Sequence, residues 1–283
     1  IQVIEVVFLI CLALIWILFA VLQDLKTKEV SNWLNFSLIV FALGFRFFWS
    51  LFSESANGFA FFYQGLIGFG IFLVLGNLFY YGRLFGGGDA KLMIALGAIL
   101  PFSEEFLINV KIFGLFLILF LFVGAGYGLC WSLVLASKNY KSFRKEFYKL
   151  WHRKKVFTLL FIFIGILLMC FYFIDSLFLV LGIFIFIMPY FYLFAKAIEN
   201  CCMLVEIPVN KLREGDWLAE NVKIKKGEVV KQDWEGISNK EISLIQKKFK
   251  KVKIKQGIVY VPVFLISFLI LIYLWFTKFY FLF

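Results

Sequence analysis

Long apolar stretches restrict most strongly what this chain can fold into. A helix of about twenty apolar residues crosses the hydrocarbon core of a bilayer, and the chain is 63% hydrophobic, with forty phenylalanines among its 283 residues. No soluble core needs so much apolar surface. We therefore predict an all-α polytopic membrane protein with about six to eight transmembrane helices. The candidate spans are residues 3–22, 33–52, 59–81, 90–102, 107–136, 157–174, 177–196 and 258–280.

The distribution of Lys and Arg predicts which linkers face the cytoplasm, because cytoplasmic loops are enriched in these residues. The basic linkers are 23–32, 82–91, 137–156 and 203–256. The linkers between them, which carry no Lys or Arg, are 53–58, 102–106 and 174–176. Eight crossings with the N-terminus outside place every basic linker in the cytoplasm. This agreement favours counting residues 90–102 as a crossing, although that segment is too short to span an ordinary bilayer easily.

The formal charge of +11 has two candidate explanations, nucleic acid and membrane orientation. The basic residues follow the topology, and anionic lipid headgroups attract such linkers. They lack the interleaved aromatic residues of a platform for single strands. We therefore predict membrane lipids as partners and no nucleic acid.

The polar block 203–256 predicts a small α+β cytoplasmic domain that rests on the membrane surface. Its strand-like segments are 207–209, 221–225 and 252–255. Ser238 and Glu241 have the spacing of a capping box that opens a helix to about Lys250.

The chain thus divides into three predicted parts. Residues 1–202 form a membrane-embedded domain, residues 203–256 the soluble domain, and residues 257–283 a C-terminal transmembrane helix.

Cysteine and histidine do not form a metal-binding pattern. The residues concerned are Cys11, Cys130, Cys170, Cys201, Cys202 and His152. No CxxC pair is present, and the single histidine has no ligand partner nearby in the sequence. We predict no metal and no cofactor.

The run Gly86-Gly87-Gly88-Asp89-Ala90-Lys91 stands between two apolar stretches. Three glycines can take positive φ and allow a close approach of another chain. Asp89 is placed to cap a helix that starts at Ala90, where an acid is favoured. A helix cap alone does not explain three successive glycines.

Asp24 ends the first span, where the negative end of the helix disfavours an anion. Lys26 and Lys28 can relieve this, and the acid can equally be an interfacial residue paired with Lys28. The predicted topology places Asp24 and Asp89 at the same cytoplasmic face, because spans two and three form a hairpin between them.

Two nearby carboxyl groups suit the hydrolysis of a peptide bond. Their pKa values separate when they share one proton. The ionised group can then activate a water molecule, and the protonated group can hydrogen-bond the scissile carbonyl. The sequence does not assign the base to Asp24 or to Asp89. Glu29 is a further acid that could contact a cationic substrate group, or is an exposed linker charge.

Gly86 to Leu92 resembles the GxGDxKL signature of type IV prepilin peptidases and archaeal preflagellin peptidases, with Gly86, Gly87, Gly88 and Lys91 supporting Asp89. Asp24 to Asn32 resembles the family's first-aspartate motif. Ser31 stands where the family commonly has proline, and the short linker 23–32 lacks the paired cysteines of bacterial members, which favours the archaeal branch.

This resemblance implies a multi-pass cell-membrane aspartic endopeptidase of the GxGD type, with Asp24 and Asp89 catalytic at the cytoplasmic face. Its substrates would be prepilin or preflagellin precursors, from which it removes a short basic leader. The alternative is an ion- or proton-coupled transporter using the same acids. That alternative predicts acids or broken helices near the bilayer midplane, and the spans contain almost none. A non-catalytic scaffold predicts that both acids are dispensable.

Overall fold

The computed structural model describes residues 3–52, 58–224, 229–233 and 236–277. The chain forms two compact units, and each is described by itself. Unit one consists of Ile1–Gly128 and Ile258–Phe283, and unit two of Leu129–Gly257. The C-terminal helix therefore belongs to the same unit as the N-terminal helices.

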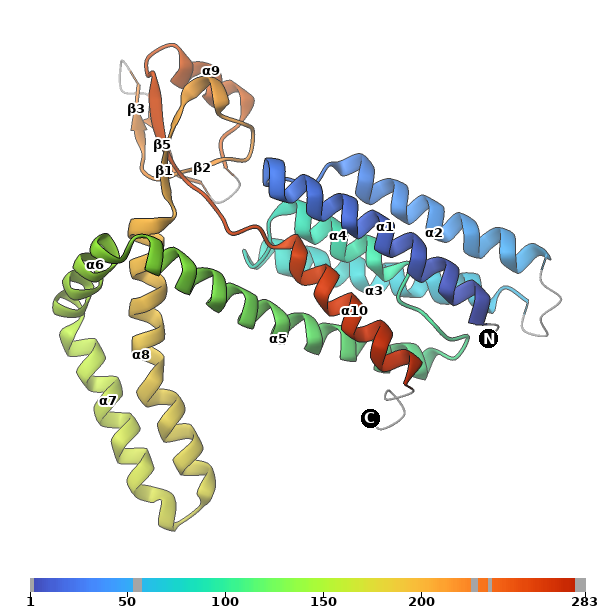
Figure 1. Ribbon diagram of the computed structural model, residues 1–283, viewed down its shortest axis with the longest axis horizontal. Helices are drawn as coiled ribbons and strands as arrows, with labels where there is room; N and C mark the ends of the chain where they lie inside the picture. Colours follow the sequence, from blue (N-terminus) through green and yellow to red (C-terminus); the bar gives the residue numbers. More distant parts are fainter. Residues whose placement is uncertain (1–2, 53–57, 225–228, 234–235, 278–283) are drawn as a thin grey trace. The chain divides into compact units, whose positions relative to one another are not determined.

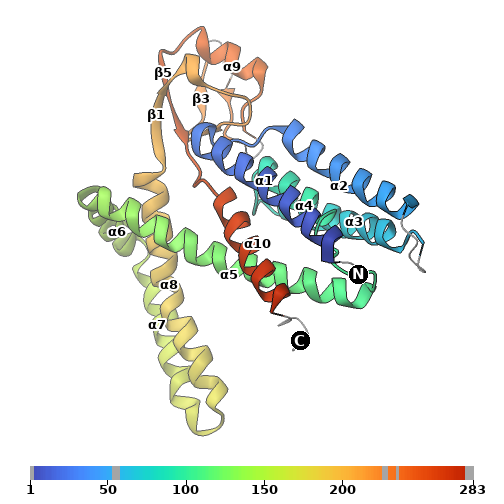
Figure 2. The same ribbon diagram turned by 45° about the vertical axis from the view of Figure 1, so that its right-hand side comes forward.

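Unit one is a bundle of helices, as Figures 1 and 2 show. Its elements are α1 (Val3–Thr27), α2 (Asn32–Phe52), α3 (Ala60–Tyr81), α4 (Gly87–Gly97), the first part of α5 (Phe106–Lys138), and α10 (Val261–Phe276). Among these, α1, α2, α3 and α5 are long and apolar enough to cross a membrane, whereas α10 is shorter in the described residues. The predicted linker 53–58 lies outside the described residues except for Gly58.

Side-chain packing fixes the α1–α2 hairpin. The Trp16 indole N–H donates to the Ser37 hydroxyl over 2.9 Å, and the rings of Phe8 and Phe45 stack with centroids 4.1 Å apart. The indole is half-buried, and this bond supplies the partner that its N–H needs. These contacts set the register in which the end of α1 lies beside the start of α2.

Glycines bring α3 and α4 into close contact. A Cβ atom at Gly68 would collide with the carbonyl oxygen of Gly97, and one at Gly97 would collide with Phe72. A Cβ at Gly76 would lie 2.6 Å from Cγ1 of Ile94. Small residues allow helix backbones to approach closely in membranes. The two helices are antiparallel, because the early part of α4 meets the late part of α3.

The predicted short span 90–102 is only partly helical. Helix α4 ends at Gly97, and the chain continues without regular structure past Pro101 before α5. Carbonyl groups outside a helix are costly in an apolar environment unless protein satisfies them. Arg46, fully buried on α2, does so here.

The Arg46 guanidinium donates to four main-chain carbonyls. Its acceptors are Ala98 (2.9 Å), Phe61 (2.9 Å), Ile99 (3.1 Å) and Pro101 (2.6 Å). Its Cζ also lies 4.3 Å from the centre of the Phe61 ring. Arg46 therefore joins α2, the start of α3 and the chain beyond α4.

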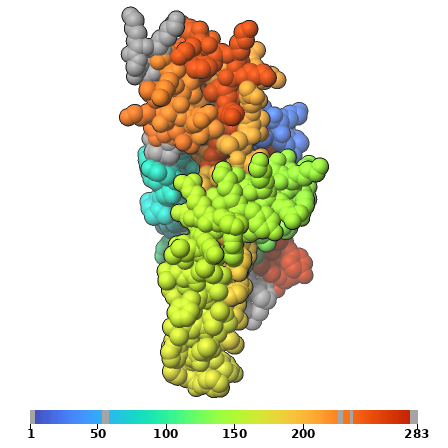
Figure 3. Space-filling view, turned by 90° about the vertical axis from the view of Figure 1, so that its left-hand side faces the viewer, coloured from blue at the N-terminus to red at the C-terminus, as the bar shows by residue number. Residues whose placement is uncertain are grey.

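The helices of unit two are the rest of α5, α6 (Tyr140–Arg153), α7 (Lys155–Cys170), the 3₁₀ turn η1 (Phe171–Phe173) and α8 (Ser176–Cys202). The segments Lys155–Phe173 and Ser176–Cys202 are long enough to cross a membrane. Gly165 and Gly182 let α7 and α8 approach backbone to backbone. Figure 3 shows α6 (green) lying across one end of this pair. The sequence prediction treated residues 137–156 as a linker and missed α6.

The remainder of unit two is a small α+β subdomain, as predicted. One sheet has the order β1-β5-β2 and the other pairs β3 with β4, all antiparallel. The elements are β1 (Leu204–Pro208), the 3₁₀ turn η2 (Val209–Lys211), β2 (Trp217–Leu218), β3 (Val222–Lys223), β4 (Val229–Val230), α9 (Asn239–Gln246) and β5 (Lys251–Lys255). The Ser238–Glu241 capping box is present, although α9 ends before the predicted Lys250. The all-α membrane fold with a small strand-containing region is thus confirmed.

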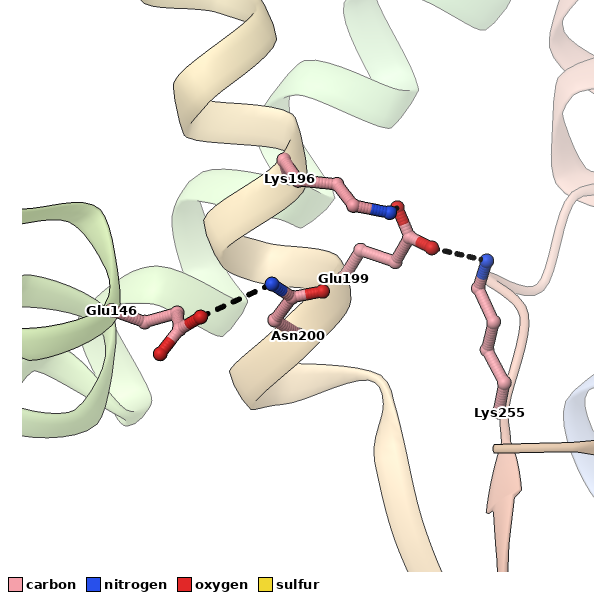
Figure 4. Close-up of polar contacts among 5 residues, drawn as sticks. All are labelled: Glu146, Lys196, Glu199, Asn200 and Lys255. Carbon is pink, nitrogen blue, oxygen red and sulfur yellow. Dashed lines mark hydrogen bonds and ion pairs between the residues drawn. The ribbon is translucent and has the colours of Figure 1, made fainter. Parts of the chain in front are cut away.

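Polar contacts connect the end of α8 with its neighbours in unit two (Figure 4). Glu199 accepts from Lys196 (2.8 Å) and from Lys255 on β5 (2.7 Å). Asn200 donates to Glu146 on α6 over 3.1 Å. The last turn of α8 therefore contacts both the sheet and α6.

Candidate active site

Asp24 lies in the last turns of α1, which continue to Thr27 rather than ending at residue 22 as predicted. Its side chain is buried, with 6% of its surface exposed. The main-chain oxygen of Asp24 accepts from the N–H of Lys28 over 2.8 Å. Lys28 itself adopts a left-handed conformation with φ of 58°, and this turn leads the chain toward α2.

The N-terminus of α10 holds the Asp24 carboxyl group. Oδ2 of Asp24 accepts from the main-chain N–H of Tyr260 (3.1 Å) and of Val261 (3.0 Å). The first N–H groups of a helix have no partner within that helix, and its N-terminal end carries partial positive charge. The α10 end therefore offsets the unfavourable position of Asp24 near the C-terminal end of α1.

Asp89 lies in the first turn of α4, and this corrects the prediction that it caps a helix starting at Ala90. Helix α4 begins at Gly87, and its N-cap is Gly86 with φ −69° and ψ 159°. The Ala90 N–H donates to the Gly86 carbonyl over 3.1 Å. An acid in the first turn is still favoured by the helix dipole.

The three glycines do not adopt the left-handed conformation that glycine allows. None of Gly86, Gly87 and Gly88 has positive φ. Gly88 instead lies against the chain before α2, where an added Cβ would be 3.4 Å from the Val30 nitrogen. Of the two uses that the sequence allowed, positive φ and close approach to another chain, the structure shows close approach.

Two polar contacts connect the start of α4 with the start of α2. The Lys91 ammonium donates to Oδ1 of Asn32 over 2.7 Å. Nδ2 of Asn35 lies 3.5 Å from the Gly88 carbonyl oxygen, and Asn35 is buried with 1% of its surface exposed. Both contacts hold the turn that carries Asp89 against the segment that follows Asp24.

The two aspartates are close enough for the charge of one to act on the other. Burial raises the pKa of Asp89 to about 7; the negative charge of Asp24 contributes in the same direction, and a hydrogen bond with the Gly86 main chain opposes the shift. The Asp89 charge also acts on the Tyr260 hydroxyl. Burial lowers the pKa of Lys28, and the nearby Asp24 charge opposes that change. The structure thus gathers Asp24, Asp89 and Tyr260 at one site.

The sequence did not indicate Tyr260 or Val261 as site residues. They act through main-chain N–H groups, which leave no side-chain signature, and they stand 236 and 237 positions after Asp24. The other predicted acid, Glu29, is exposed on the turn after α1. The described residues contain no group of three or more His, Cys, Asp or Glu side chains able to hold a metal ion.

Comparison with known proteins agrees with the two motifs. Residues 11–131 match the type IV leader peptidase family. A preflagellin peptidase of Methanocaldococcus jannaschii is 32% identical over 87 residues. That alignment covers 31% of this chain and 36% of the relative, so the chain spans about a third of the length of this curated relative. No solved structure matches the chain significantly.

The predicted resemblance to prepilin and preflagellin peptidases is therefore confirmed. The residues that match the family include both Asp24 and Asp89. They do not include α10, although its first N–H groups bind Asp24.

Proposed function

We propose that this protein is a membrane aspartic endopeptidase that removes the short basic leader of prepilin-like or preflagellin precursors. The observation that carries the proposal is a pair of acids, on α1 and α4, that lie close enough for the charge of one to act on the other. One of them, Asp24, accepts two main-chain N–H bonds. The other, Asp89, has a pKa raised to about 7 in part by the charge of the first.

The unequal surroundings of the two acids support different roles for them. The two N–H donors complement a negative charge on Asp24, so Asp24 is the proposed general base that takes a proton from water. Asp89 keeps its proton at pH values below about 7, so in that range it hydrogen-bonds the scissile carbonyl and stabilises the oxygen charge that forms there. In the second half of the reaction the proton accepted by Asp24 passes to the leaving amine.

The depth of the site suits a substrate with a polar leader and an apolar helix. Asp24 lies near the end of a helix long and apolar enough to span a membrane. The linkers beside both acids are basic, which supports a site at the cytoplasmic face. The helix of such a precursor lies in the bilayer with its leader in the cytoplasm. Its scissile bond then reaches the level of the two carboxyl groups.

The test is leader removal by single-residue variants. Full-length chain is purified with wild-type sequence or with Asp24→Asn, Asp89→Asn or Asp175→Asn, and mixed with a preflagellin that carries its basic leader. Cleavage is followed by gel shift, and the cut is located by mass spectrometry. Both active-site variants should lose at least about 1,000-fold in rate, because each removes one half of an acid–base pair.

Asp175→Asn is the matched control. Asp175 caps α8 by accepting from the Leu177 N–H over 2.8 Å, and asparagine caps helices equally well. This variant should therefore process at the wild-type rate. Leader removal that survives Asp24→Asn or Asp89→Asn in a protein that elutes as wild type would refute the proposal.

A further inference from the structure

Helix α6 has an unusual position for so polar a helix. It spans Tyr140–Arg153 and joins α5 to α7, and both neighbours are long and apolar enough to cross a membrane. Only Asn139 and Lys154 separate it from them. A helix connected so tightly to two membrane spans must lie at the boundary between bilayer and water.

The apolar side of α6 is already covered by protein. Leu150 is buried in a cluster with Leu193 and Ala197 of α8. The Phe143 ring lies 5.5 Å from that of Phe194, centre to centre. This helix therefore does not insert an apolar face into lipid, unlike an ordinary interfacial helix. Its remaining surface faces outward.

That outward surface is basic. We call the exposed side chains of α6 and its two ends the α6 cationic face, and its members are Lys138, Lys141, Arg144, Lys145, Lys149, Arg153, Lys154 and Lys155. Lys141 and Lys145 project on the side opposite the buried Leu150, as helical periodicity requires. Figure 3 shows α6 on the molecular surface of this side of the unit.

The single acid of this segment does not neutralise the face. Glu146 is half-buried and accepts from Asn200 of α8 over 3.1 Å, and from exposed Lys149 over 3.3 Å. An exposed pair of that kind contributes little. Tyr140 and Tyr148 are exposed beside the basic residues, and tyrosine is enriched at membrane interfaces.

We propose that the α6 cationic face binds the headgroups of anionic phospholipids in the cytoplasmic leaflet. The position of α6 between two spans brings the face to the headgroup level, and the charge is complementary. Basic residues near an anionic leaflet each contribute to binding through long-range attraction that salt screens. The proposal concerns a surface outside the residues that match the peptidase family, and it does not depend on the proposed catalysis.

The test compares two variants that lose the same charge. One carries Lys141→Gln, Lys145→Gln and Arg153→Gln on the face. The control carries Lys211→Gln, Lys240→Gln and Lys247→Gln, which are exposed positions of the strand-containing subdomain. All proteins are reconstituted in phosphatidylcholine vesicles with a trace of spin-labelled phosphatidylglycerol or phosphatidylcholine. Electron paramagnetic resonance then measures the fraction of each label that the protein immobilises.

The wild type should immobilise phosphatidylglycerol about threefold more strongly than phosphatidylcholine, and the preference should fall when salt rises from about 0.05 M to about 0.5 M. The face variant should lose most of this preference, and the control variant should keep it. Equal losses in the two variants, or no preference in the wild type, would overturn the proposal. A third outcome would also overturn it: the wild type and the control variant bind a DNA duplex, the face variant does not, and all three show the same lipid preference.

Discussion

At the scale of single residues, the proton on Asp89 makes the proposed reaction sensitive to pH. Burial and the Asp24 charge raise the pKa of Asp89 to about 7. Below that value, and above the pKa of Asp24, the pair holds one proton, which the proposed mechanism requires. Above it Asp89 ionises, and no carboxyl acid remains to hydrogen-bond the scissile carbonyl.

We therefore predict that kcat for leader removal falls as the pH rises above about 7, approaching a tenfold decrease per pH unit. The measurement is single-turnover cleavage of a preflagellin from pH 5.5 to pH 9, with elution volume checked at each pH. A rate that still rises between pH 8 and pH 9 would contradict the assignment of the proton to Asp89.

Stability provides a separate check of the same carboxyl group. The pKa of an aspartate side chain in water is 3.8, and that of Asp89 in the folded chain is about 7, so the folded state binds the proton more tightly. The contribution of Asp89 to stability must then fall as the pH rises through this range. Thermal unfolding should show that Asp89→Asn lessens the decrease in Tm between pH 5 and pH 8.

Arg46 is a second residue whose surroundings lead to a prediction. It satisfies four main-chain carbonyls at the start of α3 and around the end of α4. Arg46→Met orphans these acceptors, and Arg46→Lys cannot reach them all. Each change should cost about 3 kcal/mol or more of unfolding free energy, measured by thermal unfolding in detergent.

Arg144→Met is the control for Arg46, because Arg144 is exposed on α6. It should change the unfolding free energy by less than about 0.5 kcal/mol. Equal effects at the two positions would show that the buried contacts of Arg46 contribute nothing.

These residues also mark how far sequence reasoning reached. The sequence singles out Asp24 and Asp89 as candidates, because each has a local motif and the alternation of basic linkers predicts a common face for them. Their catalytic role stays a proposal. The donors on α10 could not be singled out from the sequence, because any residue except proline supplies a main-chain N–H. The role of Arg46 was equally invisible, since its acceptors are carbonyls that every residue carries.

At the scale of elements, the α3–α4 contact determines where Asp89 lies. The long spans in α1, α2, α3, α5, α7 and α8, the capping box and the strand-containing subdomain follow from apolar length, spacing and alternation, and they were predictable. The predicted span 90–102 was not borne out as a continuous helix. The residue at which α4 starts could not be predicted, because it depends on whether the three glycines join the helix. Tertiary contact with Val30 and the α3 glycines decides that choice.

Gly76→Ala should therefore impair the site from a distance. Its Cβ would lie 2.6 Å from Cγ1 of Ile94 and 3.0 Å from the Ala90 carbonyl, so α4 must shift. We expect an overpacking cost of about 1–3 kcal/mol and a fall in kcat of about tenfold or more.

Gly70→Ala is the control on the same helix, because a Cβ there meets nothing within 4 Å. It should keep wild-type kcat and be slightly more stable, since alanine is the better helix former. Cleavage assays and thermal unfolding on both variants distinguish a displaced α4 from a general effect of losing a glycine.

At the scale of the whole molecule, unit one is built from both ends of the chain. Its first 128 residues carry both acids, and the helix beginning at Val261 supplies donors to one of them. Residues 129–257 lie between these parts in sequence and form a unit of their own. This second unit contains the strongly basic α6 and the polar subdomain. The predicted orientation of the chain in the membrane therefore rests largely on the basic residues of this unit.

The orientation itself can be tested. The positive-inside rule places α6 in the cytoplasm and the α7–α8 turn outside. Fusions of alkaline phosphatase or green fluorescent protein after Lys154 and after Asp175 should report opposite sides. Phosphatase should be active only after Asp175, because it matures outside the cytoplasm, and fluorescence should appear only after Lys154. Active phosphatase after Lys154 would invert the topology and move Asp24 and Asp89 to the outer face, away from the leader of a precursor.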